Sequence, residues 1–361
     1  MSELQGKRIL FAVLNWGLGH STRSIPLIQA LSKKNRVIIA STGRSAELLK
    51  DEFPNLEHID FPDYNVRYTK KGSLLIPFLG LQLPGIIFKL IREPFETAKL
   101  VEAHNIDIVI SDCRYGVFSR KCPSFFITHQ LRFKLPRALK SLELLSEYFN
   151  RLYFNFFRRI IVIDAKDEFN LTGDLSHRGK ITRTKNLVYI GLLSSIEKAK
   201  VETDIDILIS VSGPEPQRTL FEKTVMNQIR EIQGKKVVVL GRVDEDYFYK
   251  KEKDLEIYSY VNRIEMSGLM NRSKLIVSRS GYSTVIEIAA LNKKALLIPT
   301  LGQTEQEYLA SYYRSMNLFH IAAQNNLQLK KEIEHTINNT FTDTQNIPVN
   351  DLEFIMENLT N

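Results

Sequence analysis

Residues 275–310 read LIVSRSGYSTVIEIAALNKKALLIPTLGQTEQEYLA, and this stretch decides the fold class. An apolar run at 275–277 breaks at the letters SRSG, and a helix is expected to start near Ser283. Backbone N–H groups without helical partners therefore face outward where the strand becomes the helix, which makes the turn a place for a phosphate group. The next apolar run, 295–298, ends in a second polar loop.

Polar side chains near that turn indicate what a bound phosphate would carry. Glu287 lies one helical turn past Ser283, and its carboxylate can accept hydrogen bonds from sugar hydroxyls. The second loop adds Gln303, Gln306 and Glu307 at the same end of the predicted sheet. A diphosphate, a ribose and a second sugar would fit in that order.

Length and composition set the number of domains and the kind of partner. The 361 residues exceed the size at which one core usually stops growing, so two domains are expected. Lys and Arg number 49 against 41 acids, a formal charge of +8 on a mixed surface, which favours anionic ligands or an anionic membrane face without requiring nucleic acid. Cys113 and Cys122 have neither zinc-ligand spacing nor enough partners for a disulfide framework, so a reducing cytosol fits best.

The chain start and the longest apolar neighbourhood predict no membrane segment. The first apolar run is short and is followed by Asn and Gly instead of a cleavage site, so we expect a strand and no signal peptide. Residues 74–91 are interrupted by Pro77, Gln82, Pro84 and Lys89. No transmembrane helix is therefore expected.

Short Val, Ile, Leu and Phe runs alternate with helical segments, which is typical of parallel sheets covered on both faces. In the first half, strands are expected at 8–14, 36–40, 56–59, 106–110, 124–127, 160–163 and 188–190. The alternation resumes with strands at 205–211, 236–240, 255–258, 275–277 and 295–298.

This pattern predicts an α/β protein of two doubly wound units. The first domain is expected at 1–192, a less apolar linker at 193–203 and the second domain at 204–345. Residues 346–361 hold a final short helix, and packing of that helix on the first domain is one arrangement open to it.

The first of several glycine-bearing loops follows the first strand and reads NWGLGHSTR at 15–23. Ligands of open parallel sheets gather outside the carboxyl ends of the strands. Gly17 and Gly19 permit a tight turn and close approach of a ligand, and His20 can exchange a proton near neutral pH.

The first loop of the second unit reads SVSGPEPQR at 210–218. Its residues Ser212, Gly213 and Arg218 are candidates to hold a phosphate. Arg242 follows the next strand and could add a second cation.

Each feature also has a purely structural interpretation. The glycine turns can be tight connections, His20 a capping donor, 278–281 only a helix cap, and Glu287 a first-turn carboxylate stabilised by about 0.3–1 kcal/mol through the helix dipole. The acidic pairs at 204–206 and 244–246 fit a strand entrance and a solvated turn better than a metal site. Because similar loops recur after strands of two successive units, we favour a functional cleft between the domains.

Three segments of the second predicted domain resemble a known protein family. YVN at 260–262, SRSGYSTVIEIAA at 278–290 and IPTLGQTEQEYLA at 298–310 resemble the C-terminal donor-binding domain of GT-B glycosyltransferases. The likeness is greatest to family 28, which includes the N-acetylglucosaminyltransferase of the lipid-linked peptidoglycan precursor. NWGLGHSTR resembles the N-terminal glycine-rich loop of the same group. The resemblance implies a GT-B fold, two Rossmann-like domains facing across a cleft.

The resemblance also implies roles for donor-binding residues. Backbone around Val261 and Asn262 would meet the uracil, and the helix start with Ser280 would hold the diphosphate. Gln306 and Glu307 stand where the family has paired glutamines that bind the donor sugar. Because the second residue is an acid here, the identity of the hexose is left open. The expected donor-binding set is Gly17, Gly19, Ser212, Gly213, Arg218, Arg242, Val261, Asn262, Arg279, Ser280, Gly281, Ser283, Thr284, Glu287, Gln303, Gln306 and Glu307.

The expected reaction is transfer of a hexose, with N-acetylglucosamine as the first guess, from a UDP-sugar with inversion and with neither a metal nor another cofactor required. His20 is the first candidate base, and Asp112 and His129 are the alternatives. Capping of the next turn explains Asp112 equally well. Arg218, Arg279 and helix N-termini would stabilise the departing diphosphate. GLGH and SGPEPQR depart from the family's GGTGGH and GGSQGA-like loops, so we expect a relative with a different acceptor.

Two segments of the first domain suggest where the acceptor resides. Residues 74–92 and 132–159 combine apolar and aromatic side chains with cations, and such segments can rest on an anionic bilayer. Core packing explains many of these aromatic residues as well. Peripheral contact would place a cytoplasmic protein at the inner face of the plasma membrane, with a lipid-linked or cell-envelope glycan as acceptor.

Two other functions share the predicted fold. A UDP-sugar 2-epimerase or hydrolase would act without an acceptor, and a non-catalytic sensor would bind a UDP-sugar without turnover. Nucleic-acid binding is not expected, because no basic stripe interleaved with stacking aromatics occurs on a known module. The sequence leaves the oligomeric state open.

Overall fold

The computed structural model describes residues 4–64, 75–135, 137–166, 169–177, 179, 186–242 and 246–360. The chain divides into two compact units. Unit 1 comprises Met1–Thr69, Leu74–Ser195 and Ile347–Asn361, and unit 2 is built from Ile196–Asn346.

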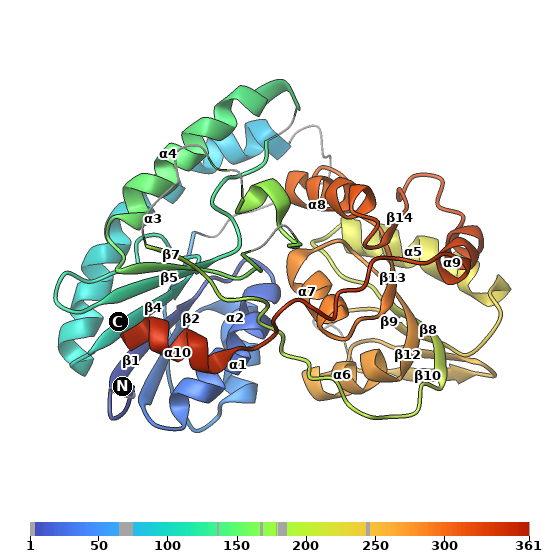
Figure 1. Ribbon diagram of the computed structural model, residues 1–361, viewed down its shortest axis with the longest axis horizontal. Helices are drawn as coiled ribbons and strands as arrows, with labels where there is room; N and C mark the ends of the chain where they lie inside the picture. The colour runs from blue at the N-terminus through green and yellow to red at the C-terminus, as the bar shows by residue number, and fades with distance from the viewer. Residues whose placement is uncertain are drawn as a thin grey trace. The chain divides into compact units, whose positions relative to one another are not determined.

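Unit 1 is a seven-stranded parallel sheet in the order β3-β2-β1-β4-β5-β6-β7 (Figure 1). Its strands are β1 Arg8–Val13, β2 Arg36–Ser41, β3 Glu57–Asp60, β4 Ile108–Asp112, β5 Ser124–Thr128, β6 Arg159–Val162 and β7 Leu187–Tyr189. Its α-helices are α1 Gly19–Ser32, α2 Gly43–Glu52, α3 Leu75–His104, α4 Glu143–Phe154 and α10 Leu352–Thr360. Short 3-10 helices lie at Arg137–Leu142 and Gly173–Leu175.

Helices cover both faces of this sheet, with α1 and α2 on one side and α3 and α4 on the other (Figure 1). The central strands β1, β2, β4 and β5 are mostly apolar runs because both of their faces are buried. Every residue of β4 and β5 is buried. Side chains of β1, β2 and β4 pack with Val101 and Ile106, and a second cluster joins β5 and β6 to Phe154 and Phe157.

Unit 2 is a second seven-stranded sheet in the order β10-β11-β9-β8-β12-β13-β14, parallel except for β10. Its strands are β8 Ile205–Ser210, β9 Lys236–Val239, β10 Tyr249–Glu252, β11 Leu255–Tyr258, β12 Ser273–Ser278, β13 Lys294–Leu297 and β14 His320–Ile321. Its helices are α5 Gln217–Gln228, α6 Arg263–Arg272, α7 Tyr282–Ala290, α8 Thr304–Ser315 and α9 Leu329–Asn338, with a 3-10 turn at Ile229–Glu231.

The sequence missed two strands of unit 2. The edge strand β10 reads YKKE and is exposed along its whole length, so it carries no apolar run. The strand β14 has two residues, which is too short for a pattern to develop. The remaining predicted strands occur within a few residues of their expected bounds, and the prediction of two doubly wound α/β units is confirmed.

Each sheet reverses its strand order at one point. In unit 1 the chain moves outward from β1 to β3 and returns to β4 beside β1, and in unit 2 it returns to β12 beside β8. Ligands of doubly wound sheets bind outside the carboxyl ends of the strands at this switch point. The loops after β1 and β4, and those after β8 and β12, therefore lie where a ligand is expected.

The C-terminal segment belongs to unit 1. Val349 bridges to Leu192, the side chain of Asn350 bonds both backbone groups of Ser194, and Arg159 Nη1 donates to Asn358 Oδ1 at 2.6 Å. These contacts hold α10 on the first unit.

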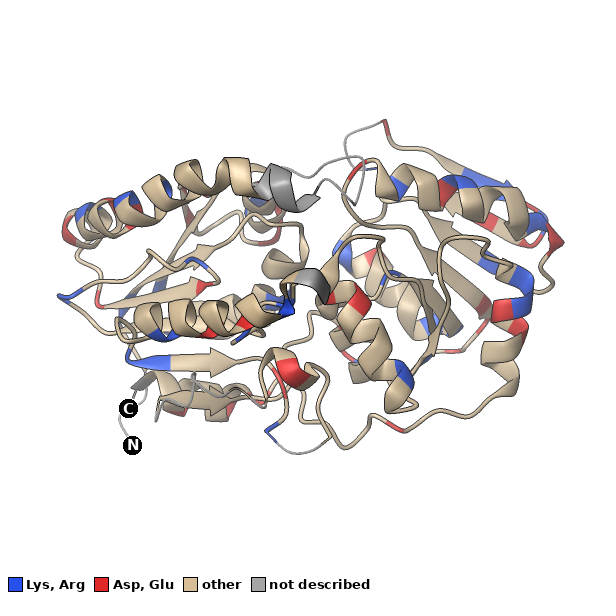
Figure 2. Cartoon of the chain, turned by 90° about the horizontal axis from the view of Figure 1, so that it is seen from above, with Lys and Arg blue, Asp and Glu red and all other residues tan. Residues whose placement is uncertain are grey.

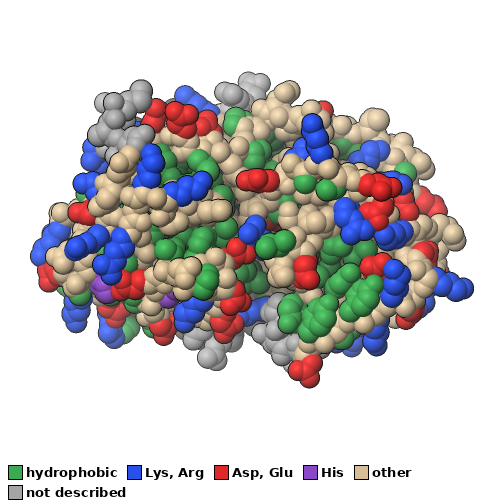
Figure 3. All heavy atoms as spheres, turned by 90° about the horizontal axis from the view of Figure 1, so that it is seen from below, with side chains coloured by type: hydrophobic (Ala, Val, Ile, Leu, Met, Phe, Trp, Pro, Cys, Tyr) green, Lys and Arg blue, Asp and Glu red, His purple; other side chains and the backbone are tan. Residues whose placement is uncertain are grey.

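The surface carries both signs of charge. Lys and Arg are interspersed with Asp and Glu along the helices of each unit (Figure 2), and the face seen in Figure 3 shows the same mixture among hydrophobic side chains. No described helix combines the length and the apolar character that crossing a lipid bilayer requires.

Candidate functional site

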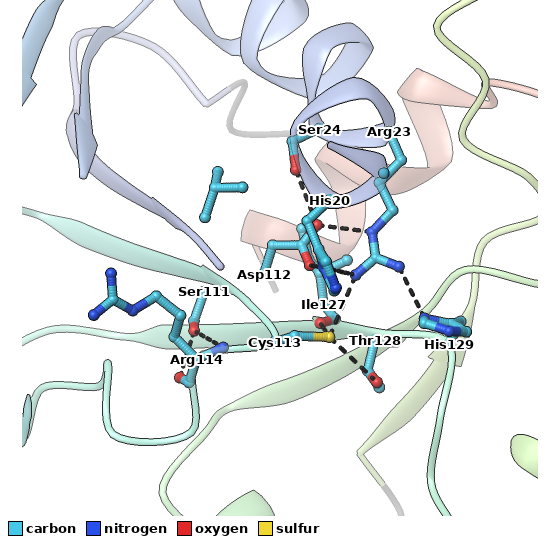
Figure 4. Close-up of polar contacts among 12 residues, drawn as sticks. His20, Arg23, Ser24, Ser111, Asp112, Cys113, Arg114, Ile127, Thr128 and His129 are labelled. Carbon is cyan, nitrogen blue, oxygen red and sulfur yellow. Dashed lines mark hydrogen bonds and ion pairs between the residues drawn. The ribbon is translucent and has the colours of Figure 1, made fainter. Parts of the chain in front are cut away.

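The switch point of unit 1 gathers a polar cluster from three elements (Figure 4). Helix α1 begins at Gly19, directly after the β1 loop, and its first turns carry His20, Arg23 and Ser24. These residues share one side of the helix because of their spacing of three and four. All three contact Asp112, the last residue of β4.

Asp112 is fully buried and has hydrogen bonds at both oxygens. Oδ2 accepts from Ser24 Oγ and Arg23 Nε, each at 2.9 Å, and Oδ1 accepts from Arg23 Nη2. His20 Nδ1 lies 2.8 Å from Oδ1. Burial acts to raise the pKa of Asp112, but the charge of Arg23 and the contact with His20 hold that pKa below its usual range. The carboxylate therefore stays ionised at neutral pH.

His20 is the titratable side chain of the cluster that keeps an unused nitrogen. Its side chain is 14% exposed, and in the described part of the chain no group bonds its Nε2. Burial, followed by the charge of Arg23, lowers the pKa of His20, and Asp112 only partly opposes this. A neutral imidazole at pH 7 is the form that can accept a proton.

His129 and Cys113 border the same guanidinium. Arg23 Nη1 lies 2.8 Å from His129 Nδ1, and Arg23 Nη2 lies 3.3 Å from Cys113 Sγ. Burial raises the pKa of Cys113 to about 12, so the thiol is neutral. The donor atoms of His20, Asp112 and Cys113 lie within 4.8 Å of one another, yet a cation that bonds two of them and a neutral thiol do not suit a metal ion.

The switch point of unit 2 presents a helix N-terminus. Helix α7 starts at Tyr282, and its N-cap residue Gly281 offers no side chain to its first N–H groups. Ser283 and Thr284 in this first turn are partly exposed. Ser280 Oγ donates to the carbonyl of Gln306 at 3.0 Å, which joins this turn to the loop after β13.

The loop between β13 and α8 is stabilised by the residues expected to read a sugar. Gln306 Oε1 accepts from Thr300 N, and Glu307 Oε1 accepts from Gly302 N, both at 2.9 Å. Gln303 is the N-cap residue of α8. Glu287 is half-buried on α7. These side chains are brought to one end of the sheet, as their positions after β12 and β13 predicted.

The three arginines of this end differ in their partners. Arg218 Nη1 and Arg242 Nε both donate to Glu222 Oε2, at 2.8 and 3.0 Å. Arg279 is buried over the ring of Phe221 at 4.3 Å, and no carboxylate among the described residues pairs with it. Arg218 and Arg242, which were expected to meet phosphate, therefore already have an acid as partner.

Neutral oxygens surround Arg279 instead. Its Nη2 donates to Gln217 O at 2.9 Å, and its Nη1 donates to Gln324 Oε1 at 2.7 Å. Burial lowers the pKa of Arg279 to about 10. Arg279 Nε and Thr300 Oγ1 are buried without a hydrogen-bond partner within the described ranges, beside Gly213. Unsatisfied polar atoms of this kind at a switch point would suit an acceptor-rich ligand group.

Two other expected positions have local roles. Asn262 forms a capping box on α6, in which its own N–H donates to Glu265 Oε2 and its Oδ1 accepts from Glu265 N, both at 2.9 Å. The Asn262 N–H is therefore engaged and not offered to a base, and Val261 precedes it. In the first loop Gly17 has φ of 81°, a conformation that favours glycine, and Gly213 has φ of 113°.

Sequence reasoning missed Arg23 and Ser24. Their spacing of three and four from His20 was the available signal, because it places them on the face of α1 that carries the histidine. Their partner Asp112 lies 89 and 88 residues away, which no local pattern reveals.

Known proteins resemble this chain in sequence and in fold. Residues 210–353 match the glycosyltransferase family 28 C-terminal domain, and residues 7–121 match a model described as glycosyl transferase family 1. Similar relatives are the UDP-N-acetylglucosamine–N-acetylmuramyl-(pentapeptide) pyrophosphoryl-undecaprenol N-acetylglucosamine transferases of two bacteria. That of Finegoldia magna is 24% identical over 80% of this chain and 76% of the relative. That of Sulfurihydrogenibium sp. is 23% identical over 89% and 87%.

Solved structures share the fold at low identity. A glycotransferase of kitacinnamycin superposes with a TM-score of 0.64 at 12% identity, over 99% of this chain and 94% of that chain. The MurG protein of Acinetobacter baumannii superposes with a TM-score of 0.57 at 12% identity, over 98% and 99%. The two doubly wound units and these matches show that the chain is a GT-B glycosyltransferase. Its C-terminal unit is a glycosyltransferase family 28 domain.

Proposed function

We propose that this glycosyltransferase moves a hexose from a UDP-sugar to a lipid-linked or cell-envelope glycan acceptor, with inversion. The names of the similar relatives support UDP-N-acetylglucosamine as the first donor to test. The observation that carries the proposal is the His20–Asp112 pair, in which the carboxylate holds one imidazole nitrogen and leaves the other available.

The chemistry follows from that pair. His20 Nε2 removes the proton of the acceptor hydroxyl while the hydroxyl oxygen attacks C1 of the hexose from the side opposite the diphosphate. The bond from C1 to the diphosphate oxygen breaks, its electron pair leaves with UDP, and the configuration at C1 inverts. Asp112 is buried and ionised, so its role is to orient His20 and stabilise the imidazolium that forms.

Unit 2 supplies the groups that suit the donor. The N-terminus of α7 and the charge of Arg279 favour the developing negative charge on the diphosphate, which supports a reaction without a required metal. Glu287 is proposed to bind the ribose, and Gln306 and Glu307 the hexose.

An exposed apolar surface on unit 1 supports a membrane-bound acceptor. The side chains that define this α3/α4 surface are Leu81, Ile87, Phe88, Ile91, Phe95, Leu144, Leu145, Tyr148 and Leu152, and all are exposed, Leu81 by 81% and Phe95 by 69%. The cations Arg92 and Lys99 on α3 and Arg151 on α4 are exposed, as is Lys140 on the 3-10 helix just before α4. Apolar side chains flanked by cations suit an anionic bilayer, which would place the protein at the inner face of the plasma membrane.

Part of the aromatic set expected at this surface belongs to the core. Phe154 and Phe157 are buried, and the ring of Tyr115 contacts those of Phe149 and Tyr153 at 5.2 and 5.7 Å. The surface therefore depends on the outward side chains of α3 and α4 rather than on every aromatic residue of the two segments.

The test incubates purified protein with UDP- and GDP-sugars and a membrane lipid extract, following nucleotide release and labelled lipid product. Release of UDP that requires lipid supports the proposal. Release without an acceptor indicates a hydrolase or 2-epimerase, and binding without release indicates a sensor; either result overturns it.

Membrane contact has its own test, flotation with phosphatidylglycerol vesicles. Phe88→Glu with Leu145→Glu is expected to abolish co-flotation, because both side chains project from the α3/α4 surface. Ile264→Glu on α6, where the side chain is 72% exposed, is the matched control and should float as the native protein does. Equal flotation of all three would contradict the membrane role.

A further inference from the structure

We propose that Arg23 is a positioning residue that gives the two histidines beside it opposite tautomers, so that His20 accepts a proton at Nε2 while His129 presents an N–H donor there. This inference rests on the proposed function and deepens it, because it separates the base from the second histidine. Arg23 is 2% exposed and lies between the two rings (Figure 4).

The tautomer of His129 follows from the chemistry of a guanidinium. Arg23 Nη1 lies 2.8 Å from His129 Nδ1, and a guanidinium can donate but cannot accept. His129 Nδ1 must therefore be the acceptor, and the hydrogen of the neutral ring is on Nε2. The amide nitrogen of Gln130 lies 3.2 Å from this Nε2, and a half-turn of the amide brings its oxygen there to accept.

The tautomer of His20 follows from the surplus of donors around it. Its Nδ1 lies 2.8 Å from both Asp112 Oδ1 and Arg23 Nη2. The two hydrogens of Nη2 have other acceptors, because Nη2 donates to Asp112 Oδ1 and to Cys113 Sγ. A carboxylate only accepts, so His20 Nδ1–H donates to Asp112 and the lone pair of the ring is on Nε2.

The charge of Arg23 also keeps the base unprotonated. The groups that face His20 are Arg23 on α1, Asp112 at the end of β4, and His129 and Cys113 beside the guanidinium. Arg23 and His129 lower the pKa of His20, whereas Asp112 raises it. Loss of the arginine charge leaves Asp112 without its cation, so the pKa of His20 must rise.

The imidazole rings of His20 and His129 therefore have different roles in the proposed reaction. His20 takes the proton of the acceptor hydroxyl at Nε2, whereas His129, whose Nδ1 accepts from Arg23 and whose Nε2–H faces the side-chain amide of Gln130, does not take a proton. Arg23 itself touches neither the hydroxyl nor the sugar in this scheme, and acts through the two histidines.

The direct experiment is long-range 1H–15N NMR of the seven histidines in the unliganded protein, with His20→Gln and His129→Gln to assign the signals. The expected result is His20 protonated at Nδ1 and His129 at Nε2. His20 protonated at Nε2, or His129 at Nδ1, would overturn the inference. Because no substrate is present, a wrong donor or acceptor in the proposed function does not affect this readout.

Variants of Arg23 test the causal role. Arg23→Gln is expected to move the lower limb of the kcat/KM pH profile to higher pH, because the pKa of His20 rises, and to leave His129 as a mixture of tautomers. Arg23→Lys retains the charge and should restore the limb in large part. Arg36→Gln, which removes an exposed cation paired with Glu57, is the control and should leave the profile unchanged.

If Arg23→Gln does not fold, as judged by circular dichroism, the tautomers of the native protein and the profile of Arg23→Lys still decide the question. An Arg23→Gln enzyme with native tautomers and a native pH profile but lower kcat would show a merely structural arginine and refute the proposal.

Discussion

The two switch points of this glycosyltransferase each bury an arginine, but they treat its charge in opposite ways. In unit 1 Arg23 is paired with the buried carboxylate of Asp112. In unit 2 Arg279 is buried among carbonyl and amide oxygens, and none of the described acids pairs with it. Burial of a charge without a counter-ion destabilises the folded protein, whereas a paired charge needs no further ligand to offset that cost. The first arrangement suits proton transfer, and the second suits the binding of an anion.

Removal of the counter-ion in unit 1 is expected to have the largest effect. Asp112→Asn should lower kcat by about 10³- to 10⁴-fold, because His20 loses the acceptor that holds its tautomer. It should also destabilise the fold by about 3–5 kcal/mol, since Arg23 becomes an unpaired buried charge. Steady-state kinetics and urea denaturation measure the two effects. The variant Glu57→Gln, which changes a partly exposed carboxylate on the edge strand β3, should change neither, and an active Asp112→Asn enzyme would contradict the role of this pair.

Removal of the arginine in unit 2 should weaken ligand binding without destabilising the free protein. Arg279→Met should weaken UDP binding by about 10- to 100-fold while the free protein keeps or gains stability, because the unpaired buried charge disappears. Calorimetry with UDP and pyrophosphate, together with denaturation, tests this. The corresponding Arg23→Met should destabilise the free protein instead. Equal losses of stability in Arg23→Met and Arg279→Met would contradict the difference in charge pairing between the two units.

A smaller effect is expected at the ribose. Glu287→Ala should weaken UDP binding by about tenfold, since the lower end of the contribution of a hydrogen bond to a charged group, about 1.5 kcal/mol, corresponds to about a factor of ten. Calorimetry should show that the native protein prefers UDP to 2′-deoxy-UDP and that this preference shrinks in the variant. An unchanged dissociation constant would remove Glu287 from the donor site.

The smallest effect concerns stability against pH. The folded pKa of His20 is lowered, so between the unfolded value of about 6.5 and the folded value the unfolded chain binds more protons. Stability from this group is complete above the unfolded pKa and is lost as the pH falls toward the folded one. His20→Gln should therefore flatten the fall in unfolding free energy from pH 7 to pH 5. A variant curve parallel to the native one would show that the ring is not desolvated.

Much of the fold followed from local patterns. Apolar runs of three to seven residues predicted most strands of both sheets, and the polar loops after β1, β8, β12 and β13 were found where ligands of such sheets bind. His20, Asp112 and His129 were proposed as three alternative bases, and the structure brings them together around one guanidinium.

What failed to follow from the sequence was the pairing of charges. Arg218 and Arg242 looked like phosphate ligands, yet both donate to Glu222, which lies 4 residues from one and 20 from the other. Arg279 looked like one cation among three and is the one without an acid in the described chain.

By itself, the sequence determined which segments are buried strands, which loops end them and which family 28 features they carry, because burial leaves a local apolar period. Only the tertiary structure decided that Arg23 joins His20 to His129 and that Arg279 keeps an uncompensated charge. The reason is physical: a side chain's protonation and pairing depend on what strand register brings within 3 Å or so, across separations as large as 106 residues.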